Sequence, residues 1–395
     1  MREYALERLQ ADRIATGHYA RLWHRVMPSY GNISGTILPD FVEEAIADAP
    51  ERDWIASWGM ESSKGSTKND GCFAAPSLLL AGADLTKDQS YFLCGVDGRA
   101  FRNVLFPLGE LVKIKADGIN NGDGRISSGD AKSVRDIAIE AGLPTASKRE
   151  SMGICFVGKR TFQSFISQYL PSVPQPGNFI DVDTGEVSII WLCYIQLCGF
   201  FMPTTFVCYV LLMNIYAHFP LQIVGKHQGA SHFTIGQGAK ISGASRKWFI
   251  VGRASEDNGT VFVCGDTHHP ALYATELFID ANEFNWIGGA LPVPMEHGEK
   301  LSALCRTRHL QPLIPCTVKM EKDVSNARII VRFDRPVRAI TPGQTAAIYV
   351  GGGLICLGGG QIACAGPSFH QNGRELPRLL HPAGQNDLST ARRAE

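Results

Sequence analysis

Two segments in the first half of the chain carry apolar residues at the 3.6-residue period of an α-helix. The first, 131–142, ends at Gly142, and the second, 161–170, is followed by Pro171; both residues are helix stop signals. A charged segment at 1–10 has leucines spaced as on a surface helix. We therefore expect two amphipathic helices and one surface helix in these positions.

After Pro171 the pattern changes to short runs of β-branched and aromatic residues separated by turn signals, which is typical of strands. The first series of runs is 179–187, 231–238, 247–254 and 260–266. The second series is 277–287, 301–310, 314–320, 327–334, 344–350 and 361–367. Many short strands at this spacing predict a small β-barrel or sandwich. The glycines of GGGLICLGGG (351–360) favour tight turns over a phosphate-binding loop.

One stretch stands apart because it holds no Asp, Glu, Lys or Arg from Val187 to Gly225. A membrane-spanning helix needs about 20 apolar residues, so 188–217 is long enough to be one. Pro203 would kink such a helix, which membrane spans tolerate. Three interpretations stay open: a true membrane span, a buried hairpin, and an insertion foreign to the fold.

A second unusual stretch, 116–130, resembles a calcium-binding loop around Asp123 and Gly124. Ile119 stands where the first carboxylate ligand belongs, and Asp130 replaces the bidentate glutamate at the last position. We therefore favour a turn-rich insertion over a calcium site.

The composition excludes several classes of protein. The 395 residues are enough for two or three domains, and 38 basic residues balance 38 acidic ones. A protein-wide basic field for nucleic acid is therefore excluded, and a hydrophobic content of 45% excludes a fully disordered chain. Eleven cysteines with no C-x-x-C pair, and no secretory signal, indicate a reducing compartment.

Two groups of potential metal ligands occur in the β-rich half. They are Cys264 with His268 and His269, and Cys305 with His309 and Cys316. Neither group supplies four ligands at the spacing of a structural zinc site. We expect loop histidines and core cysteines here, and no stable metal site.

One cysteine, Cys155, lies in the basic segment ASKRESMGICFVGKR at 146–160. Cationic neighbours lower the pKa of a thiol and favour the thiolate, which is the reactive form. Cys155 is therefore a candidate nucleophile. The alternative is that it is a small buried hydrophobic residue between Ile154 and Phe156.

Local charge differs from the overall balance. Residues 301–350 hold eight basic side chains against three acidic ones, a local net charge of +5. The basic residues are Arg306, Arg308, Lys319, Lys322, Arg328, Arg332, Arg335 and Arg338. A β-barrel with a basic face suits contact with a nucleic-acid backbone, although an ordinary solvated face is the alternative.

Nine segments follow one another in an informative order. They are ADRIATGHYAR (11–21), KDQSYFL (87–93), LFPLGEL (105–111), VRDIAIEAGLPTASKRESMGICFVGKR (134–160), FISQYLPSVPQPGNFID (165–181), VGKHQGASHFTIGQ (224–237), HPALY (269–273), RTRH (306–309), and VRAITPGQTAAIYV with CLGGG (337–360). Each is weak alone, but the ordered set closely resembles the tRNA-specific 2-thiouridylases, in particular the mitochondrial type. The resemblance implies an incomplete α/β ATP-pyrophosphatase-like (PP-loop) domain, a small central α+β domain and a C-terminal β-barrel.

The same resemblance implies domain limits. The domains are 1–160, with 114–133 as an insertion; 161–274, with the apolar insertion 188–223; 275–367, the barrel; and 368–395, a disordered tail. Family members run directly across both insertion points. We therefore expect both insertions to be translated intron sequence or errors of the gene model.

The resemblance also implies a reaction. Members of this family thiolate position 2 of the wobble uridine (U34) of tRNA, using ATP, with Mg²⁺ expected, to adenylate the uracil oxygen. A cysteine persulfide, charged by a sulfur-relay protein, delivers the sulfur, and a second cysteine resolves it and leaves a disulfide bond. The matching persulfide position is Cys155. The expected partners are tRNA and the sulfur donor, and DNA is not expected.

Further roles carry over by position. Gly17 matches an ATP-contacting glycine. The positions that match tRNA contacts are His18, Lys87, Asp88, Gln89, Arg308, His309 and Gln344. The family usually has Tyr where His309 stands.

The departures from the family define the alternatives. The SGGVDS-type loop for ATP phosphates and the N-P-D-x-x-C segment with the other catalytic cysteine do not occur in this sequence. We therefore expect an N-terminally truncated member that cannot adenylate uridine as written. The alternatives are a non-catalytic tRNA-binding remnant and a membrane-associated protein anchored through 188–217. Intron-like insertions and the family type favour a mitochondrial location, with the cytoplasm as the alternative.

Overall fold

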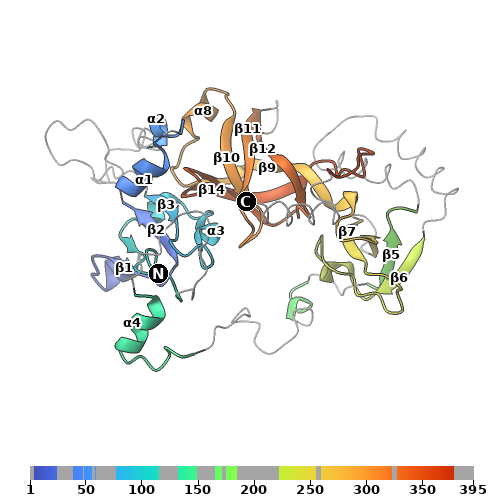
Figure 1. The fold of residues 1–395 in the computed structure, drawn as a ribbon, viewed down its shortest axis with the longest axis horizontal. Helices are drawn as coiled ribbons and strands as arrows, with labels where there is room; N and C mark the ends of the chain where they lie inside the picture. The colour runs from blue at the N-terminus through green and yellow to red at the C-terminus, as the bar shows by residue number, and fades with distance from the viewer. Residues whose placement is uncertain are drawn as a thin grey trace, which may run out of the picture. The chain divides into compact units, whose positions relative to one another are not determined.

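The computed structural model describes residues 4–24, 39–47, 49–55, 58, 77–114, 132–148, 165–170, 175–184, 222–254, 259–322 and 327–377 (Figure 1). The chain forms two compact units. The first unit comprises Met1–Glu150, Ile279–Asp334 and Gln344–Ile362. The second unit comprises Ser151–Phe278, Arg335–Gly343 and Ala363–Glu395.

A closed barrel of six strands is the centre of the first unit, with strand order β13-β10-β11-β12-β9-β14 and a further pairing of β13 with β14. Its strands are β9 (Tyr273–Trp286), β10 (Leu301–Arg306), β11 (Ile314–Lys322), β12 (Ala327–Arg338), β13 (Thr345–Val350) and β14 (Ile355–Ala365). Alternate side chains point into the core, as the period of two in a strand requires. On β12, for example, Ile329, Val331 and Phe333 are buried. The prediction of a small barrel is confirmed.

A glycine turn joins the last two strands of the barrel. Gly351, Gly352 and Gly353 all have positive φ angles of 60–92°, in the region where a Cβ atom is disfavoured. The predicted tight turn is therefore present at this end of GGGLICLGGG. Its second glycine triplet differs, because Gly358 and its neighbours lie within strand β14.

Two strands from the N-terminal part of the chain extend the barrel sheet to eight strands. Strand β3 (Leu78–Ala81) pairs antiparallel with β14, with Leu80 opposite Ile355, and pairs on its other edge with β2 (Ala20–Trp23). All four residues of β3 are buried. The apolar run LLLA therefore serves as an inner strand of this sheet.

The remaining elements of the first unit are short. They are a π-helical turn (Tyr4–Arg8), β1 (Ile14–Ala15), α1 (Asp40–Ala45), α2 (Arg52–Ile55), α3 (Ser90–Leu93), a 3-10 turn (Gly98–Phe101), β4 (Val104–Leu105), α4 (Val134–Glu140) and α8 (Val293–Glu296). Helix α4 confirms the predicted helix. It begins with a capping box of Ser133 and Asp136 and ends before Gly142, whose φ is +64°. Strand β1 pairs in parallel with β4.

A four-stranded sheet of order β6-β5-β8-β7 forms the second unit. Its strands are β5 (Gly177–Asp181), β6 (Ile223–His227), β7 (Phe249–Arg253) and β8 (Thr260–Cys264). Two hydrophobic clusters divide its alternating residues: Ile180 and Phe262 belong to one, while Phe179 and Val261 belong to the other. Both faces of the sheet are therefore covered by apolar side chains.

The predicted strand at 231–238 is wrong. The structure has a 3-10 turn, Ala230–His232, followed by a turn in which the Thr234 amide donates to Oε1 of Gln237. Gly236, with a φ of +83°, interrupts the extended backbone. Only an isolated bridge between Gly238 and Phe249 remains.

Several predictions fall partly or wholly outside the described residues. Most of 114–133, most of 188–223 and the end of the tail, 378–395, are among them. The beginning of the predicted tail is placed: the Phe369 amide donates to the Tyr273 carbonyl, and Phe369 packs on the first cluster. Among the described residues, no helix has the length and apolar character needed to cross a membrane.

Candidate nucleic-acid interface

Asp88 fixes the KDQSYFL segment onto the barrel. Its Oδ1 accepts hydrogen bonds from the Gly82 and Ser90 amides at 3.0 and 3.1 Å. Its Oδ2 accepts one from the Ser90 hydroxyl at 2.8 Å and faces Nη1 of Arg306 at 3.3 Å. Asp88 is only 1% exposed. The carboxylate therefore positions the segment, and a direct contact of this group with RNA stays a prediction.

Two tyrosines continue this connection. The Tyr91 hydroxyl donates to the Thr345 carbonyl at 2.9 Å, and Ser90 Oγ lies 3.1 Å from the Tyr349 hydroxyl. Burial raises the pKa of Tyr91 to about 12, so the hydroxyl keeps its proton and stays a donor at neutral pH. Helix α3 is thus held to strand β13 by neutral hydrogen bonds.

Gln89 links the same segment to the GHYA loop between β1 and β2. The Gln89 amide donates to the Tyr19 carbonyl at 2.9 Å, and the Tyr19 amide donates to Gln89 Oε1 at 3.0 Å. Next to Tyr19, the His18 ring lies 2.7 Å from the Thr16 hydroxyl and 5.1 Å, between ring centroids, from Phe106. The structure thereby brings two of the predicted tRNA-contacting segments side by side.

An exposed aromatic pair lies at the junction of α3 and the barrel. Phe92 is 60% exposed, and its ring centroid is 4.4 Å from that of His309. Nε2 of His309 donates to the Asp88 carbonyl at 3.1 Å, which holds the imidazole against this segment. Sequence reasoning missed Phe92.

A pocket of about 260 Å³ adjoins this pair. Its lining residues are Tyr91, Phe92, Cys94, Gly95, Glu283, Asn285, Thr345, Gly359, Gly360 and Gln361. The Asn285 side-chain amide spans the base of α3, donating to the carbonyls of Cys94 and Val96 at 2.9 and 3.0 Å. The pocket thus has an aromatic side and a polar side.

The other predicted contacts lie on the same unit. Arg308 is near enough to Tyr91 for its charge to lower the pKa of that hydroxyl, against the larger effect of burial. Oε1 of Gln344, one residue before β13, is buried and has no hydrogen-bond partner among the described residues. Gly17 is exposed, and a Cβ atom there would make only an ordinary contact with Leu108.

The basic residues of 301–350 do not form one continuous face. Arg306 is turned inward to Asp88, and Arg328 pairs with Glu321. Arg338 belongs to the second unit, where it donates to the Thr267 and Gly236 carbonyls. Lys319 and Arg332 remain on the non-core side of β11 and β12. Only part of the predicted local charge is therefore available to a ligand.

Cys155 lies outside the described residues, so its prediction stays untested by geometry. The described cysteines are free thiols, and all are buried except Cys364, which is partly exposed. Burial raises the pKa of both Cys94 and Cys264 to about 12. These two thiols are poor nucleophiles at neutral pH. The predicted disulfide bond has no counterpart among the described cysteines.

Comparison with known protein families assigns three domains to the chain. Residues 66–122 and 126–159 match the tRNA methyl transferase HUP domain, 214–265 match the tRNA methyl transferase PRC-barrel domain, and 278–362 match the aminomethyltransferase beta-barrel domain. A nucleotide-binding α/β domain, a small central domain and a closed barrel define the class of the protein. The predicted fold class is confirmed.

Individual relatives narrow the class. The chain is 38% identical over 286 residues to a tRNA-specific 2-thiouridylase of Chlamydia pneumoniae, covering 72% of this chain and 60% of that protein. It is 32% identical over 367 residues to mitochondrial tRNA-specific 2-thiouridylase 1 of Danio rerio; the match covers 93% of this chain and 67% of that protein. It is 31% identical over 382 residues to the Gallus gallus protein of the same name; that match covers 94% of this chain and 69% of the relative. The chain belongs to the tRNA-specific 2-thiouridylase family.

Proposed function

We propose that the first unit binds the anticodon region of tRNA and that the protein serves in ATP-dependent thiolation of the wobble uridine. The observation that carries this proposal is the junction of three segments: Asp88 pairs with Arg306, Gln89 hydrogen-bonds to Tyr19, and the His309 ring packs against Phe92. These contacts join the three segments of the first unit to which His18, Lys87 and Arg308 belong. Because the chain spans only about 60% of the length of its chlamydial relative, the complete reaction is part of the proposal.

The chemistry of this region suits single-stranded RNA. Unstacked bases bind to exposed aromatic faces, and Phe92 supplies such a face beside the 260 Å³ pocket. Lys87 and Arg308 supply positive charge for phosphates. Oε1 of Gln344 is buried, so a contact of this atom with RNA requires the side chain to turn outward. The buried Asp88 carboxylate positions its neighbours Lys87 and Gln89.

In the proposed reaction, the uracil O2 attacks ATP and pyrophosphate leaves. The outer sulfur of a persulfide on Cys155 then attacks C2, and AMP departs with the former O2. A second thiol attacks Cys155, so that a disulfide forms as the sulfur remains on the base. Gly17, exposed in the loop after the parallel strand β1, is the proposed ATP contact, since α/β proteins bind ligands where such strands end. A separate relay protein is the proposed sulfur donor.

The printed sequence contains neither an SGGVDS-type loop nor an N-P-D-x-x-C segment. We infer that these 395 residues bind tRNA but do not adenylate it unless those groups are supplied. A non-catalytic tRNA-binding role is therefore the second candidate function. The mitochondrial names of the zebrafish and chicken relatives support a mitochondrial location, and the cytoplasm is the alternative.

Binding of a fluorescent anticodon stem-loop to the full chain tests the proposal. We expect saturable binding that weakens as salt rises, because phosphate contacts release counterions. The Lys87→Ala variant should bind more weakly and with a smaller salt slope, whereas Lys240→Ala, a lysine of the second unit, should bind as the unaltered chain does. Absence of binding, or equal binding by both variants, would refute the interface. Thiolation of tRNA with ATP and a persulfide donor would instead refute the non-catalytic alternative.

A further inference from the structure

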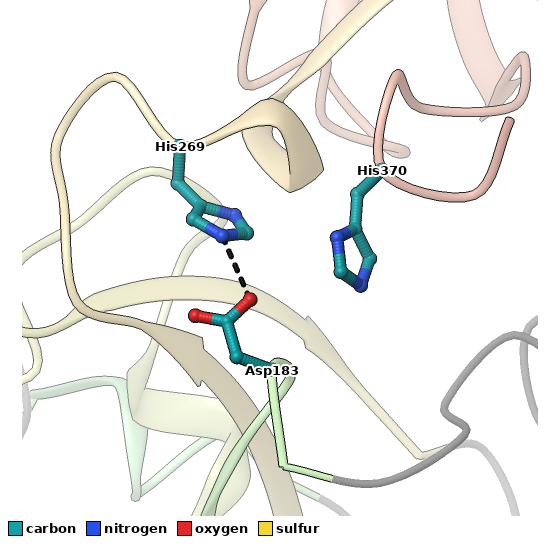
Figure 2. Close-up of side chains that lie close together, drawn as sticks. All are labelled: Asp183, His269 and His370. Atoms are coloured by element: carbon teal, nitrogen blue, oxygen red, sulfur yellow. Dashed lines mark hydrogen bonds and ion pairs between the residues drawn. The ribbon is translucent and has the colours of Figure 1, made fainter. Parts of the chain in front are cut away.

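Three potential metal ligands converge in the second unit, in a place that the proposed tRNA interface does not use. Asp183, His269 and His370 each offer one ligand atom, and the three atoms lie within 4.8 Å of one another. Figure 2 shows the three side chains grouped around a common space, with the His269 ring bonded to the Asp183 carboxylate. They come from three separate parts of the sequence.

The geometry points to a zinc ion bound by Asp183, His269 and His370, and we propose this site as a property of the protein beyond tRNA thiolation. Imidazole nitrogens with one carboxylate oxygen are typical zinc ligands, and three protein ligands leave a fourth position for water. Bonds of about 2.0–2.2 Å would place the ligand atoms roughly 3.3–3.5 Å apart in a tetrahedron. The three ligand atoms lie within 4.8 Å of one another, so the group must contract by on the order of 1 Å, while His269 Nε2 and Asp183 Oδ1, now 2.9 Å apart, must separate slightly.

Nε2 of His269 faces the proposed site, but zinc binding would change the hydrogen bonds of this ring. Its Nδ1 accepts a hydrogen bond from the Ala271 amide at 3.1 Å, so Nδ1 carries a lone pair and the ring proton is on Nε2. Nε2 faces Asp183 Oδ1 at 2.9 Å. A histidine that binds zinc through Nε2 keeps a proton on Nδ1 and donates it to a second acceptor. Zinc at Nε2 of His269 would therefore require the ring proton to move from Nε2 to Nδ1, which breaks the hydrogen bond from the Ala271 amide.

The backbone that carries each ligand is also fixed. Asp183 follows strand β5, and its amide donates to Asp181 Oδ1 at 3.1 Å. His269 caps the 3-10 turn Pro270–Leu272. The turn that carries His370 is closed by two hydrogen bonds, from the Gly373 amide to the His370 carbonyl and from the Arg374 amide to the Phe369 carbonyl, at 3.0 and 2.8 Å.

The two neighbouring ligand candidates from the sequence do not join the site. His268 Nδ1 lies 2.7 Å from the Tyr273 hydroxyl, and the Cys264 thiol is buried and donates to the Asp266 carbonyl. The site therefore takes only His269 from that group and adds two residues that are distant in sequence. A bound ion would tie the 368–377 segment to the sheet of the second unit.

Metal analysis of the full chain tests the proposal. After chelation and dialysis against zinc chloride, we expect one zinc ion per chain at this site. The Asp183→Asn and His370→Ala variants should lose more affinity than the roughly 10–100-fold that changes to outer-shell residues cause. His297→Ala, an exposed histidine of the first unit, is the matched control and should bind zinc normally.

Cobalt substitution separates this site from one made by cysteines. The chain holds eleven cysteines, and thiolate ligands would give a strong charge-transfer absorption in the cobalt protein. We expect tetrahedral cobalt absorption without that band. A thiolate band, zinc retained by both variants, or no zinc bound by the correctly folded full chain would each overturn the proposal; circular dichroism of every variant establishes folding.

Discussion

Asp88 and Arg306 form an ion pair between a loop and a barrel strand that are far apart in the sequence. Nη1 of Arg306 lies 3.3 Å from Oδ2 of Asp88, and the two side chains are 9% and 1% exposed. A charge this deeply buried is tolerated only when it is paired and hydrogen-bonded. The pair therefore makes the correct placement of the KDQSYFL segment a condition for a stable barrel.

Asp88→Ala should destabilise the first unit by about 3–5 kcal/mol, because it leaves the Arg306 charge buried without compensation. Denaturant unfolding of the full chain measures this loss. Asp97→Ala is the matched control: Asp97 pairs with Arg99 on the surface, and such a pair contributes at most about 1 kcal/mol. Equal stability of the two variants would show that Asp88 does not hold the segment.

Phe92→Ala should weaken binding of the anticodon stem-loop by about 5- to 150-fold, because stacking of a base on an aromatic ring contributes roughly 1–3 kcal/mol. Stability should change little, since Phe92 is 60% exposed. Phe92→Trp should retain binding. The control is Leu85→Ala, which removes a 55% exposed apolar side chain from the loop before α3 and should leave affinity unchanged. If Leu85→Ala and Phe92→Ala reduce affinity equally, general hydrophobic contact explains the binding.

Alkylation at pH 8 should separate the cysteines by reactivity. Cys94 and Cys264 should resist iodoacetamide in the native protein, because burial raises the pKa of each thiol to about 12. Cys155 should react first, since its basic neighbours favour the thiolate. Peptide mass spectrometry after timed quenching gives the order. Labelling of Cys94 as fast as Cys155 would contradict both assignments, and labelling in denaturant confirms that each peptide is detectable.

Stability should decrease at alkaline pH. The pKa of the Cys94 thiol rises from 9.0 to about 12 on burial, so between these values the unfolded chain loses a proton that the native chain keeps. The contribution is complete below pH 9 and is lost as the pH rises towards 12. Urea unfolding at a series of pH values measures the decline. It should be shallower in Cys94→Ala, and an unchanged slope in that variant would assign the decline to other groups.

Hydrophobic periodicity and turn residues correctly predicted those helices and strands that are determined by neighbouring residues in the sequence. The 3.6-residue period and Gly142 place helix α4 correctly, and alternating runs place the barrel strands. The strand expected at 231–238 failed because Gly236 adopts a positive φ that periodicity does not report. The ordered set of motifs identified the family and the fold class, and no single motif would have been sufficient.

Contacts between residues far apart in the chain could not be predicted from the sequence. The pairing of β3 with β14 joins residues at opposite ends of the chain, and nothing in LLLA specifies its partner. Asp183, His269 and His370 show the same limit, because metal motifs are recognised by short spacings and these residues are far apart. Phe92 shows a different limit of the sequence, because the exposure of an aromatic side chain depends on its neighbours in space.

The pairing of β3 with β14 sets an order of events during synthesis. Ribosomes release the N-terminal part first, so Leu79 and Leu80 emerge long before Ile355 and Cys356, the residues that complete their sheet. Until then strand β3 presents an unpaired edge with entirely apolar side chains, which invites association with other chains. We therefore expect this edge to stay open to other chains until the segment around Ile355 and Cys356 has been synthesised.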